Sequence, residues 1–554
     1  MIQCLKNTAF TDILEFLNIY RFTETIPNAH NSTEEDKDYT EENDISSNNS
    51  TDVSMVDGLT TYSKDLEQPS DNENIIDTEQ TKSMKDPFLI TWNGKNDPEI
   101  PTNWSDFKKF FTVAQLIFAS WIAYTASSIY VPGQENIEQD FHSSHVVATL
   151  NLSMFVLGYG LGPMLLSPLS EVAIIGRQPI YIWSQFVFTI IQIGCATVNN
   201  MAGLIIMRFI AGIACSPVLT NSGASVMDCI TQKNSVPVLA IWSFGTVFAP
   251  VTAPLLGACM TVAKDWRWIF WLVLFLSAFS FVFLFFTLPE TSHTAVLSRR
   301  ASRIRKQTGD NRYYTIQEKL DSQMEPREFL LETFYRPIYM IVNDPVILAF
   351  DVYISVVYGV FYLFFEAFPI VFVDIYHFNL IQLGLSYIGF SVGAGMALVA
   401  LLYFTYKVIN PSRDKGTFFP ELYLLPSMYF SWFLPFSLFL FGWAASVHWI
   451  VPMISEAFFL TAMESLFEAT FSYFAEGYPH HVASAYAGNG LMRCVFACIF
   501  PIFGKAMYDR LATKNYPVAW GSSLVGFITL FLAVIPFLLY KHGPALRAKS
   551  KFAN

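Results

Sequence analysis

Twelve separate runs of apolar residues, each long enough to cross a bilayer as a helix, constrain this chain more than any other feature. Only 14% of its residues are charged, against about 25% in ordinary soluble proteins. Backbone N–H and C=O groups in lipid have no water to hydrogen-bond, so they must find partners within the protein, and a helix provides these within its own segment. We therefore predict an all-α polytopic membrane protein with spans at 107–130, 146–169, 180–198, 202–228, 236–260, 267–288, 346–373, 383–406, 420–443, 449–474, 482–504 and 518–540.

A long polar connection divides these runs into six and six. It covers residues 289–345 and contains nine basic residues. Two sets of six spans are the pattern expected of two pseudo-related halves around a central site. We predict an N-terminal six-helix bundle at 107–288, a C-terminal six-helix bundle at 346–540 and a C-terminal tail at 541–554.

The N-terminal region differs in composition from the rest. Residues 1–100 contain 21 acidic and 7 basic residues, whereas the whole chain contains 46 and 34. Residues 1–85 are too polar to bury a core, so we predict a mostly disordered acidic tail with a short helix within 5–22. Residues 86–106 then form a pre-membrane segment. The acidity belongs to the tail and does not identify a substrate, and no basic patch indicates nucleic acid.

The basic residues also predict the orientation. Those between spans gather in the loops that would be internal if the N-terminus is cytoplasmic, above all in the connection 289–345. Because internal loops are enriched in Lys and Arg, we predict that both termini are cytoplasmic.

A short polar turn joins the second and third spans. Glu171 and Arg177 lie within it, and Asp228, at the predicted cytoplasmic end of the fourth span, is a natural partner for Arg177. Gly158 and Gly162, four residues apart, would let another helix approach closely. An ordinary charged turn between two membrane helices is the simpler interpretation.

Several segments together resemble one family. They are GPMLLSPLSEVAIIGR at 162–177, Trp266-Arg267-Trp268, LPETSHTAVLSRRASRIR after the sixth span, FFEAFPIVF in the seventh and YPVAWGSSLVGF at the twelfth. These segments are similar to the major facilitator superfamily, in the form of the fungal twelve-span drug:proton antiporters of the yeast fluconazole- and benomyl-resistance subgroup. The resemblance covers residues 86–554 and implies the major facilitator fold. It also implies a latch role for Glu171 and Arg177 that holds one face closed.

Arg208 lies about 9 Å into the fourth span at 1.5 Å per residue. A charge at that depth is expensive enough to indicate function. The family resemblance implies a role in proton coupling for this arginine. The alternative is a structural arginine that bonds helix carbonyls.

The fifth span carries small residues four apart, with prolines beside two of them: Gly245, Ala249, Pro250, Ala253, Pro254 and Gly257. Small side chains permit close helix contact, and prolines invite bending. This pattern resembles the fifth-helix signature that is associated with antiporters. A packing seam without bearing on transport direction is the alternative.

Four membrane glutamates are candidates for carrying protons: Glu366, Glu456, Glu464 and Glu468. Glu464 and Glu468 must share a helix face, and if both faced one cavity, at least one would tend to hold a proton. Glu366 lies among aromatic residues. Structural acids at helix ends are the alternative for each of them.

Six aromatic side chains are candidates for an adaptable wall of a substrate site: Trp121, Tyr124, Trp242, Tyr358, Phe361 and Phe365. Contact with lipid or packing within the bundle is equally consistent with the sequence for each of them. The histidines do not cluster, and we interpret His142, His145 and His448 as solvated loop residues. No metal site, cofactor site, nucleotide-binding loop or convincing catalytic set is found, so we predict neither an enzyme nor an ATP-driven pump.

The preferred hypothesis is a plasma-membrane exporter of apolar or cationic toxic compounds, such as azoles and benomyl-like fungicides, driven by inward proton flow. A proton-coupled transporter of a polyamine or other small metabolite is the main alternative. A non-transporting membrane sensor that signals through the acidic tail is the second.

Overall fold

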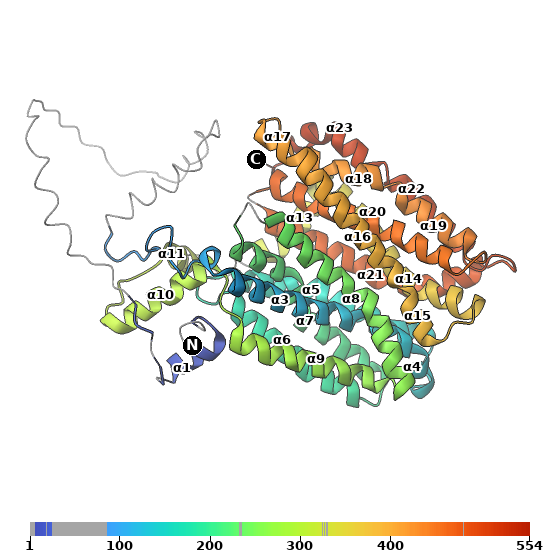
Figure 1. The fold of residues 1–554 in the computed structure, drawn as a ribbon, viewed down its shortest axis with the longest axis horizontal. Coiled ribbons are helices and arrows are strands. Elements are labelled where there is room, and N and C mark those ends of the chain that lie inside the picture. Colours follow the sequence, from blue (N-terminus) through green and yellow to red (C-terminus); the bar gives the residue numbers. More distant parts are fainter. Residues whose placement is uncertain are drawn as a thin grey trace, which may run out of the picture.

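In the computed structural model, the described part of the chain contains twelve helices that are long and apolar enough to cross a membrane. Figure 1 shows how the helices are arranged. The structure describes residues 6–17, 19–20, 22–24, 86–231, 235–323, 325, 327, 331–479 and 481–553. Each of the twelve helices overlaps one predicted span, so the predicted all-α membrane architecture is confirmed. No strand forms within these described ranges. Most of the predicted acidic tail, residues 25–85, lies outside them.

The first half contains six spans. Their helices are α3 (Asp106–Ser128), extended by η3 (Val131–Gly133) and α4 (Gln134–Asp140), then α5 (His145–Glu171), α6 (Arg177–Thr197), α7 (Met201–Cys229), α8 (Ser235–Ala263) and α9 (Arg267–Thr287). Two short elements precede them, α1 (Ala9–Phe16), within the segment predicted to hold a helix, and η2 (Pro101–Asn103).

The connection between the halves is largely helical, and the second half again contains six spans. The connection comprises α10 (His293–Thr308), α11 (Ile316–Gln323), η5 (Leu331–Tyr335) and α13 (Arg336–Asn343). The second half comprises α14 (Pro345–Phe368) with η6 (Pro369–Ile375), α15 (Leu380–Ser386), α16 (Ile388–Phe404) with η7 (Thr405–Ile409) and α17 (Asn410–Asp414), η8 (Pro420–Tyr423), α18 (Leu424–Phe430), α19 (Phe433–Ala444), α20 (Ile450–Gly477), α21 (Val482–Leu511), α22 (Ala519–Leu532) and α23 (Ile535–Arg547).

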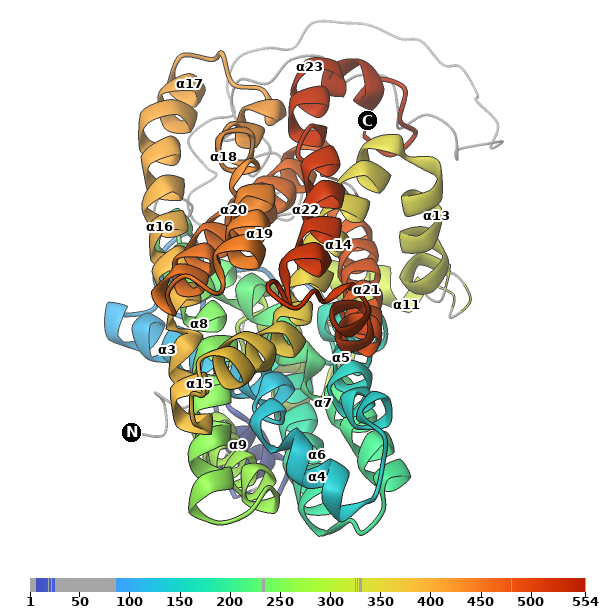
Figure 2. The same ribbon diagram turned by 90° about the vertical axis from the view of Figure 1, so that its right-hand side faces the viewer.

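The two halves lie side by side, and the bundle has two distinct ends (Figure 1). We call the end that carries α10 and α11 the linker face, and the end that carries α4 and α15 the opposite face. Figure 2 views the opposite face, where α15 of the second half lies near α4 and α8 of the first. The α15 helix packs directly on α8, since a Cβ on Gly384 would lie 2.6 Å from the Cα of Leu255.

Polar residues fix where the spans begin. Asn200 caps α7 by accepting a hydrogen bond from the backbone N–H of Gly203. Asp344 caps α14 by accepting bonds from the N–H groups of Val346 and Ile347, at 2.9 and 3.2 Å. These side chains satisfy donors that a helix start leaves without partners.

Glycines set the closest helix contact in the first half. A Cβ on Gly158 of α5 would lie 2.3 Å from the carbonyl oxygen of Phe209 in α7, and one on Gly212 would lie 2.2 Å from that of Phe155. Only glycine permits this backbone approach, as the spacing of Gly158 and Gly162 predicts. The contact holds α7 and its Arg208 against α5.

Candidate functional site

An apolar cleft opens between the two halves. Its walls come from α8 of the first half and from α16 and α20 of the second. The lining residues are mostly apolar, with a few polar groups from α8 and α20: Ser243, Phe244, Val247, Ala394, Ala397, Leu398, Leu401, Ile409, Tyr423, Pro426, Glu464, Ser465, Glu468, Ala469 and Ser472. An apolar wall with few polar groups is typical of small-molecule sites.

Glu464 and Glu468 both line this cleft. They lie one turn apart on α20, so the helical spacing that places them on one face also directs both carboxyl groups to the same space. Ser243 of α8 hydrogen-bonds Glu468 from the other half. The cleft therefore combines two carboxyl groups with an apolar wall, and the carboxyl group of Glu468 links the two halves.

A network of tyrosines joins the halves at the centre of the bundle. The hydroxyl of Tyr159 in α5 lies 2.7 Å from that of Tyr358 and 2.8 Å from that of Tyr362, both in α14. The Tyr362 hydroxyl also lies 3.5 Å from Ser127 Oγ of α3. Movement of one half against the other must break or exchange these bonds.

Arg208 is fully buried and bonds backbone carbonyls. Its guanidinium donates to the carbonyl oxygens of Ala126 (2.6 Å), Ser127 (3.0 Å) and Asn151 (3.2 Å). Ala126 and Ser127 lie in the last turn of α3, where carbonyls have no partner within the helix. Arg208 therefore caps α3 and meets the negative end of its dipole, which corresponds to the structural alternative for this residue.

A second arginine faces the same centre from the other half. The Arg493 guanidinium of α21 lies 5.3 Å from the rings of Tyr358 and Phe467. Cations are attracted to aromatic faces, and the ring of Tyr358 belongs to the tyrosine network. Arg493 of the second half thus contacts that network directly, whereas the buried Arg208 of the first half reaches it through Ser127.

On the linker face, Arg177 and Asp228 form an ion pair with 3.0 Å between Nη1 and Oδ2. Glu171 forms no ion pair with Arg177. The buried Glu290 instead accepts hydrogen bonds from the backbone N–H groups of Arg177 (3.1 Å) and Gln178 (3.2 Å) at the start of α6. Sequence reasoning missed Glu290, although it belongs to the quoted LPETSH segment.

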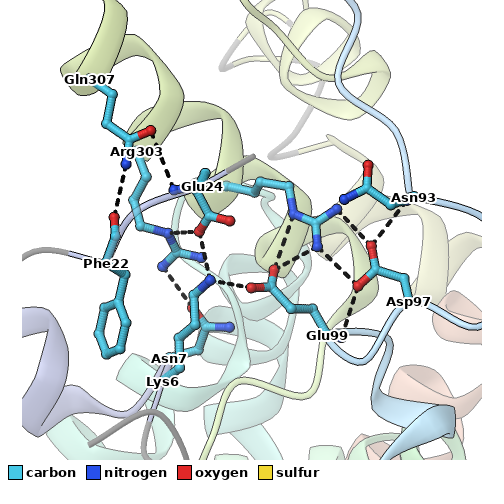
Figure 3. Close-up of polar contacts among 10 residues, drawn as sticks. Lys6, Asn7, Phe22, Glu24, Asn93, Asp97, Glu99, Arg303 and Gln307 are labelled. Carbon is cyan, nitrogen blue, oxygen red and sulfur yellow. Dashed lines mark hydrogen bonds and ion pairs between the residues drawn. The ribbon is translucent and has the colours of Figure 1, made fainter. Parts of the chain in front are cut away.

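A cluster of ion pairs ties the linker helix α10 to the N-terminal segments (Figure 3). Arg300 pairs with Asp97 at 2.8 Å and with Glu99 at 2.9 Å. Lys6 bridges Glu24 (2.7 Å) and Glu99, and Arg303 also pairs with Glu24. We call these six residues the linker clamp.

The linker clamp depends on ionised acids. Burial acts to raise the pKa of Asp97, but hydrogen bonds from Arg300 and from backbone N–H groups outweigh it and leave the pKa below its usual value. The pKa of Glu99 is likewise lowered, because Lys6 and Arg300 outweigh its burial. Both carboxylates are therefore charged at neutral pH.

On the opposite face, His145 and Glu366 pair across the halves. The Nε2 atom of His145 in α5 lies 2.8 Å from Oε2 of Glu366 in α14. Thr149 donates to the other oxygen of Glu366 at 3.3 Å. The interpretation of His145 as a solvated loop residue is therefore wrong. Local sequence patterns could not reveal this contact, because the partner of His145 is 221 residues away in the chain.

Glu456 lies deep in the second half and is fully buried. Neither of its carboxyl oxygens has a hydrogen-bond partner among the described residues. It lies against Gly389 of α16, where a Cβ would approach its Oε2 within 2.6 Å. A charged carboxylate without partners is costly to bury. Glu456 therefore remains a candidate for a proton that is taken up in one conformation and lost in another.

The small residues of α8 pack within the first half. A Cβ on Gly257 would lie 2.2 Å from the carbonyl of Ile129, and one on Gly245 would lie 2.6 Å from Ile117. Ala249 and Ala253 are fully buried. This face is a close-packed seam against α3, and α8 continues as one helix through both of its prolines.

The candidate aromatic residues divide between the centre and the two halves. Tyr358 belongs to the tyrosine network, and the Tyr124 ring lies 6.3 Å from that of Tyr159. Within the first half, the indole N–H of Trp121 donates to Thr252 and that of Trp242 donates to Ser222. In the second half, Phe361 packs on Phe390 and Phe365 packs on Tyr387. None of the six is among the lining residues of the cleft.

Comparison with known proteins identifies the family. The sequence profile of the family described as Major Facilitator Superfamily matches residues 116–501. The chain belongs to the major facilitator superfamily. It is 52% identical to Fluconazole resistance protein 1 of Saccharomyces cerevisiae, over 99% of this chain and 98% of that protein. It is 50% identical to Multidrug transporter FLR2 of Candida glabrata, over 100% of this chain and 99% of that protein.

A solved structure has the same fold at low sequence identity. The partially occluded inward-open conformation of the xylose transporter XylE from E. coli matches with a TM-score of 0.56 and 13% identity. The match covers 79% of this chain and 98% of that chain. The predicted major facilitator fold is thereby confirmed. No group of residues suited to a metal ion occurs in the described part of the chain.

Proposed function

We propose that this protein is a multidrug efflux transporter that exports apolar or cationic toxic compounds in exchange for protons. The cleft between the halves carries this proposal, because it places Glu464 and Glu468 in an apolar wall that both halves build. Such a site suits a lipophilic cation, whose charge meets a carboxylate while its rings bury against Phe244 and Leu398. The names of the relatives, a fluconazole-resistance protein and a multidrug transporter, support export of azoles and related compounds.

Transport proceeds by alternating access. The halves meet on the opposite face through His145, Glu366 and the contact of α15 with α8, so this conformation is closed there. Rocking of the halves would break the Tyr159 bonds and open that face while the linker face closes. The Arg177–Asp228 pair on the linker face is then part of a latch that exchanges partners during the cycle.

Protons supply the driving force in this proposal. Each proton that crosses 100 mV contributes about 2.3 kcal/mol. Glu456, Glu464 and Glu468 are the proposed carriers, and Arg208, which bonds the backbone of Ser127 beside the tyrosine network, is proposed to assist coupling. We propose that the linker face, which carries the basic residues of α10, is cytoplasmic, in accord with the positive-inside rule, and that the opposite face is exposed to the outside at the plasma membrane. The protein acts as a transporter and not as an enzyme.

Transport by purified protein in liposomes tests this proposal. An imposed pH gradient, acid on the side of the opposite face, should drive rhodamine 6G and radiolabelled fluconazole into the acidic compartment, and a protonophore should abolish the uptake. Glu464→Gln and Glu468→Gln should each slow uptake of the cationic dye at least tenfold. Glu476→Gln is the matched control, because this residue of α20 pairs with Arg413 at an exposed position outside the cleft.

The alternatives give different results in the same assay. A polyamine transporter would move spermidine with the pH gradient and leave both drugs behind. A membrane sensor would move no compound under any gradient. Either outcome would overturn the proposal of drug export.

A further inference from the structure

His145 holds two carboxylates at once on the opposite face. Its Nε2 atom lies 2.8 Å from Glu366 of the second half, and its Nδ1 atom lies 2.8 Å from Oε1 of Glu138 in α4. The Glu366 side chain is 6% exposed, whereas that of His145 is 28% exposed. The ring is thus reached by solvent while it bridges the two halves.

With Glu138 and Glu366 ionised, this geometry requires a protonated ring. A neutral imidazole has one donor and one acceptor nitrogen, whereas an ionised carboxylate only accepts hydrogen bonds. Both bonds therefore form together only when His145 is an imidazolium. Loss of the proton removes one bond and turns a nitrogen lone pair toward a carboxylate oxygen.

The surroundings of the pair are polar and charged. Glu135 and Glu138 of α4 and Lys505 of α21 line a surface pocket together with His145, and Glu366 faces the ring from α14. Of these groups, Glu135, Glu138 and Glu366 are acids and Lys505 is a cation. The acids attract a proton to the ring from the solvent of this face.

The Glu366 carboxylate is held in place on its other sides. Thr149 donates to it from α5, and Gly504 of α21 packs so closely that a Cβ there would lie 3.3 Å from Glu366 Cβ and Cγ. Glu366 therefore has little freedom to find another partner while the face is closed. The proton on His145 decides whether the contact between the halves is attractive.

We propose that His145 and Glu366 form a proton-operated gate: protonation of His145 from the solvent of the opposite face closes that face, and deprotonation releases it. This inference rests on the proposed transport function and deepens it. Glu366 then serves the gate as a fixed anion, and the gate proton returns to the side from which it came. External acid would thereby favour the return of the emptied transporter to the conformation that is open to the cytoplasm.

Distance measurement on the full-length protein in liposomes tests the gate without any substrate. Spin labels at Ser144→Cys, the residue that precedes α5, and at Asp374→Cys in η6, both at exposed positions on this face, report the separation of the halves. Native cysteines are replaced first. Lowering the pH from about 8 to about 5.5, across the usual range of histidine titration, should raise the closed-to-open ratio about tenfold.

Two substitutions of His145 make the test specific. His145→Gln, which is never charged, should leave the face largely open and remove the pH response. His145→Lys, which stays charged, should keep the face closed at both pH values. His142→Asn is the control at an exposed histidine in the turn directly before α5 and should respond as the unmodified protein does. Size-exclusion profiles establish that each variant is folded.

The results separate this proposal from the proposed function. An unchanged pH response in His145→Gln, or an open face in His145→Lys, would overturn the gate even if drugs are transported. A pH-dependent gate in a protein that moves no drug would support the gate and count against drug export alone.

Discussion

Removal of Arg208 should destabilise the first half, whether or not this residue also takes part in proton coupling. Its guanidinium bonds the carbonyls of Ala126 and Ser127, which end α3, and that of Asn151 in α5. Hydrogen bonds to a charged group contribute about 1.5–3 kcal/mol each. Arg208→Ala leaves these carbonyls without the donor in a fully buried site, so we expect a loss on the order of 3–5 kcal/mol of stability.

Arg208→Lys separates the structural contribution from the coupling. A lysine ammonium is a single point charge that cannot reproduce the planar fork, so about half of the bonds should be lost. We expect a stability between those of the unmodified protein and Arg208→Ala, measured by thermal unfolding in detergent with size-exclusion detection. Arg510→Ala, an exposed change at the end of α21, should have little effect.

Transport by the folded fraction of Arg208→Lys gives the second readout. If this arginine also couples protons, the variant should move drug down its gradient but fail to accumulate it under an imposed pH gradient. An Arg208→Ala protein as stable as the unmodified chain would refute the helix-capping argument. Full drug accumulation by folded Arg208→Lys would remove this residue from coupling.

The remaining predictions concern packing and the linker clamp. Gly212→Ala should cost about 1–3 kcal/mol, because the added Cβ would meet the Phe155 carbonyl, whereas Gly395→Ala, with open space around it, should be neutral or slightly stabilising in the same unfolding assay. Asp97 has a lowered pKa, so its contribution to stability is complete above its unfolded value of 3.8 and is lost as the pH falls further; hydrogen exchange in α10 should therefore rise only in strong acid. Arg300→Ala should raise that exchange at neutral pH.

The twelve spans were predictable because their signal is local. A membrane helix needs about twenty apolar residues in a row, and this chain interrupts each run with polar turns. The shared face of Glu464 and Glu468 follows equally from helix geometry, since residues four apart lie together. Whether that face lines a cleft depends on α8 and α16, whose positions no local pattern contains.

The contacts between distant segments were not predictable in the same way. Glu290 reaches the start of α6 across 113 residues, where it accepts a hydrogen bond from the backbone N–H of Arg177. An acid in a Pro-Glu-Thr segment directly after a span was the available signal. The role of Arg208 shows the same limit, because a cap on α3 appears only when the end of that helix is placed beside it.

The two faces of the transporter are held by groups that differ in their response to acid. Arginine stays charged at all physiological pH values, so moderate acidity does not change the charge of Arg177 on the linker face. Histidine changes charge near neutral pH, so the His145–Glu366 pair on the opposite face changes with moderate acidity. In the proposed gate, acid on the opposite face protonates His145 and thereby strengthens closure of that face. An exporter must close its outer face after each release of substrate. With the opposite face outside the cell, as proposed, external acid therefore favours this closing step.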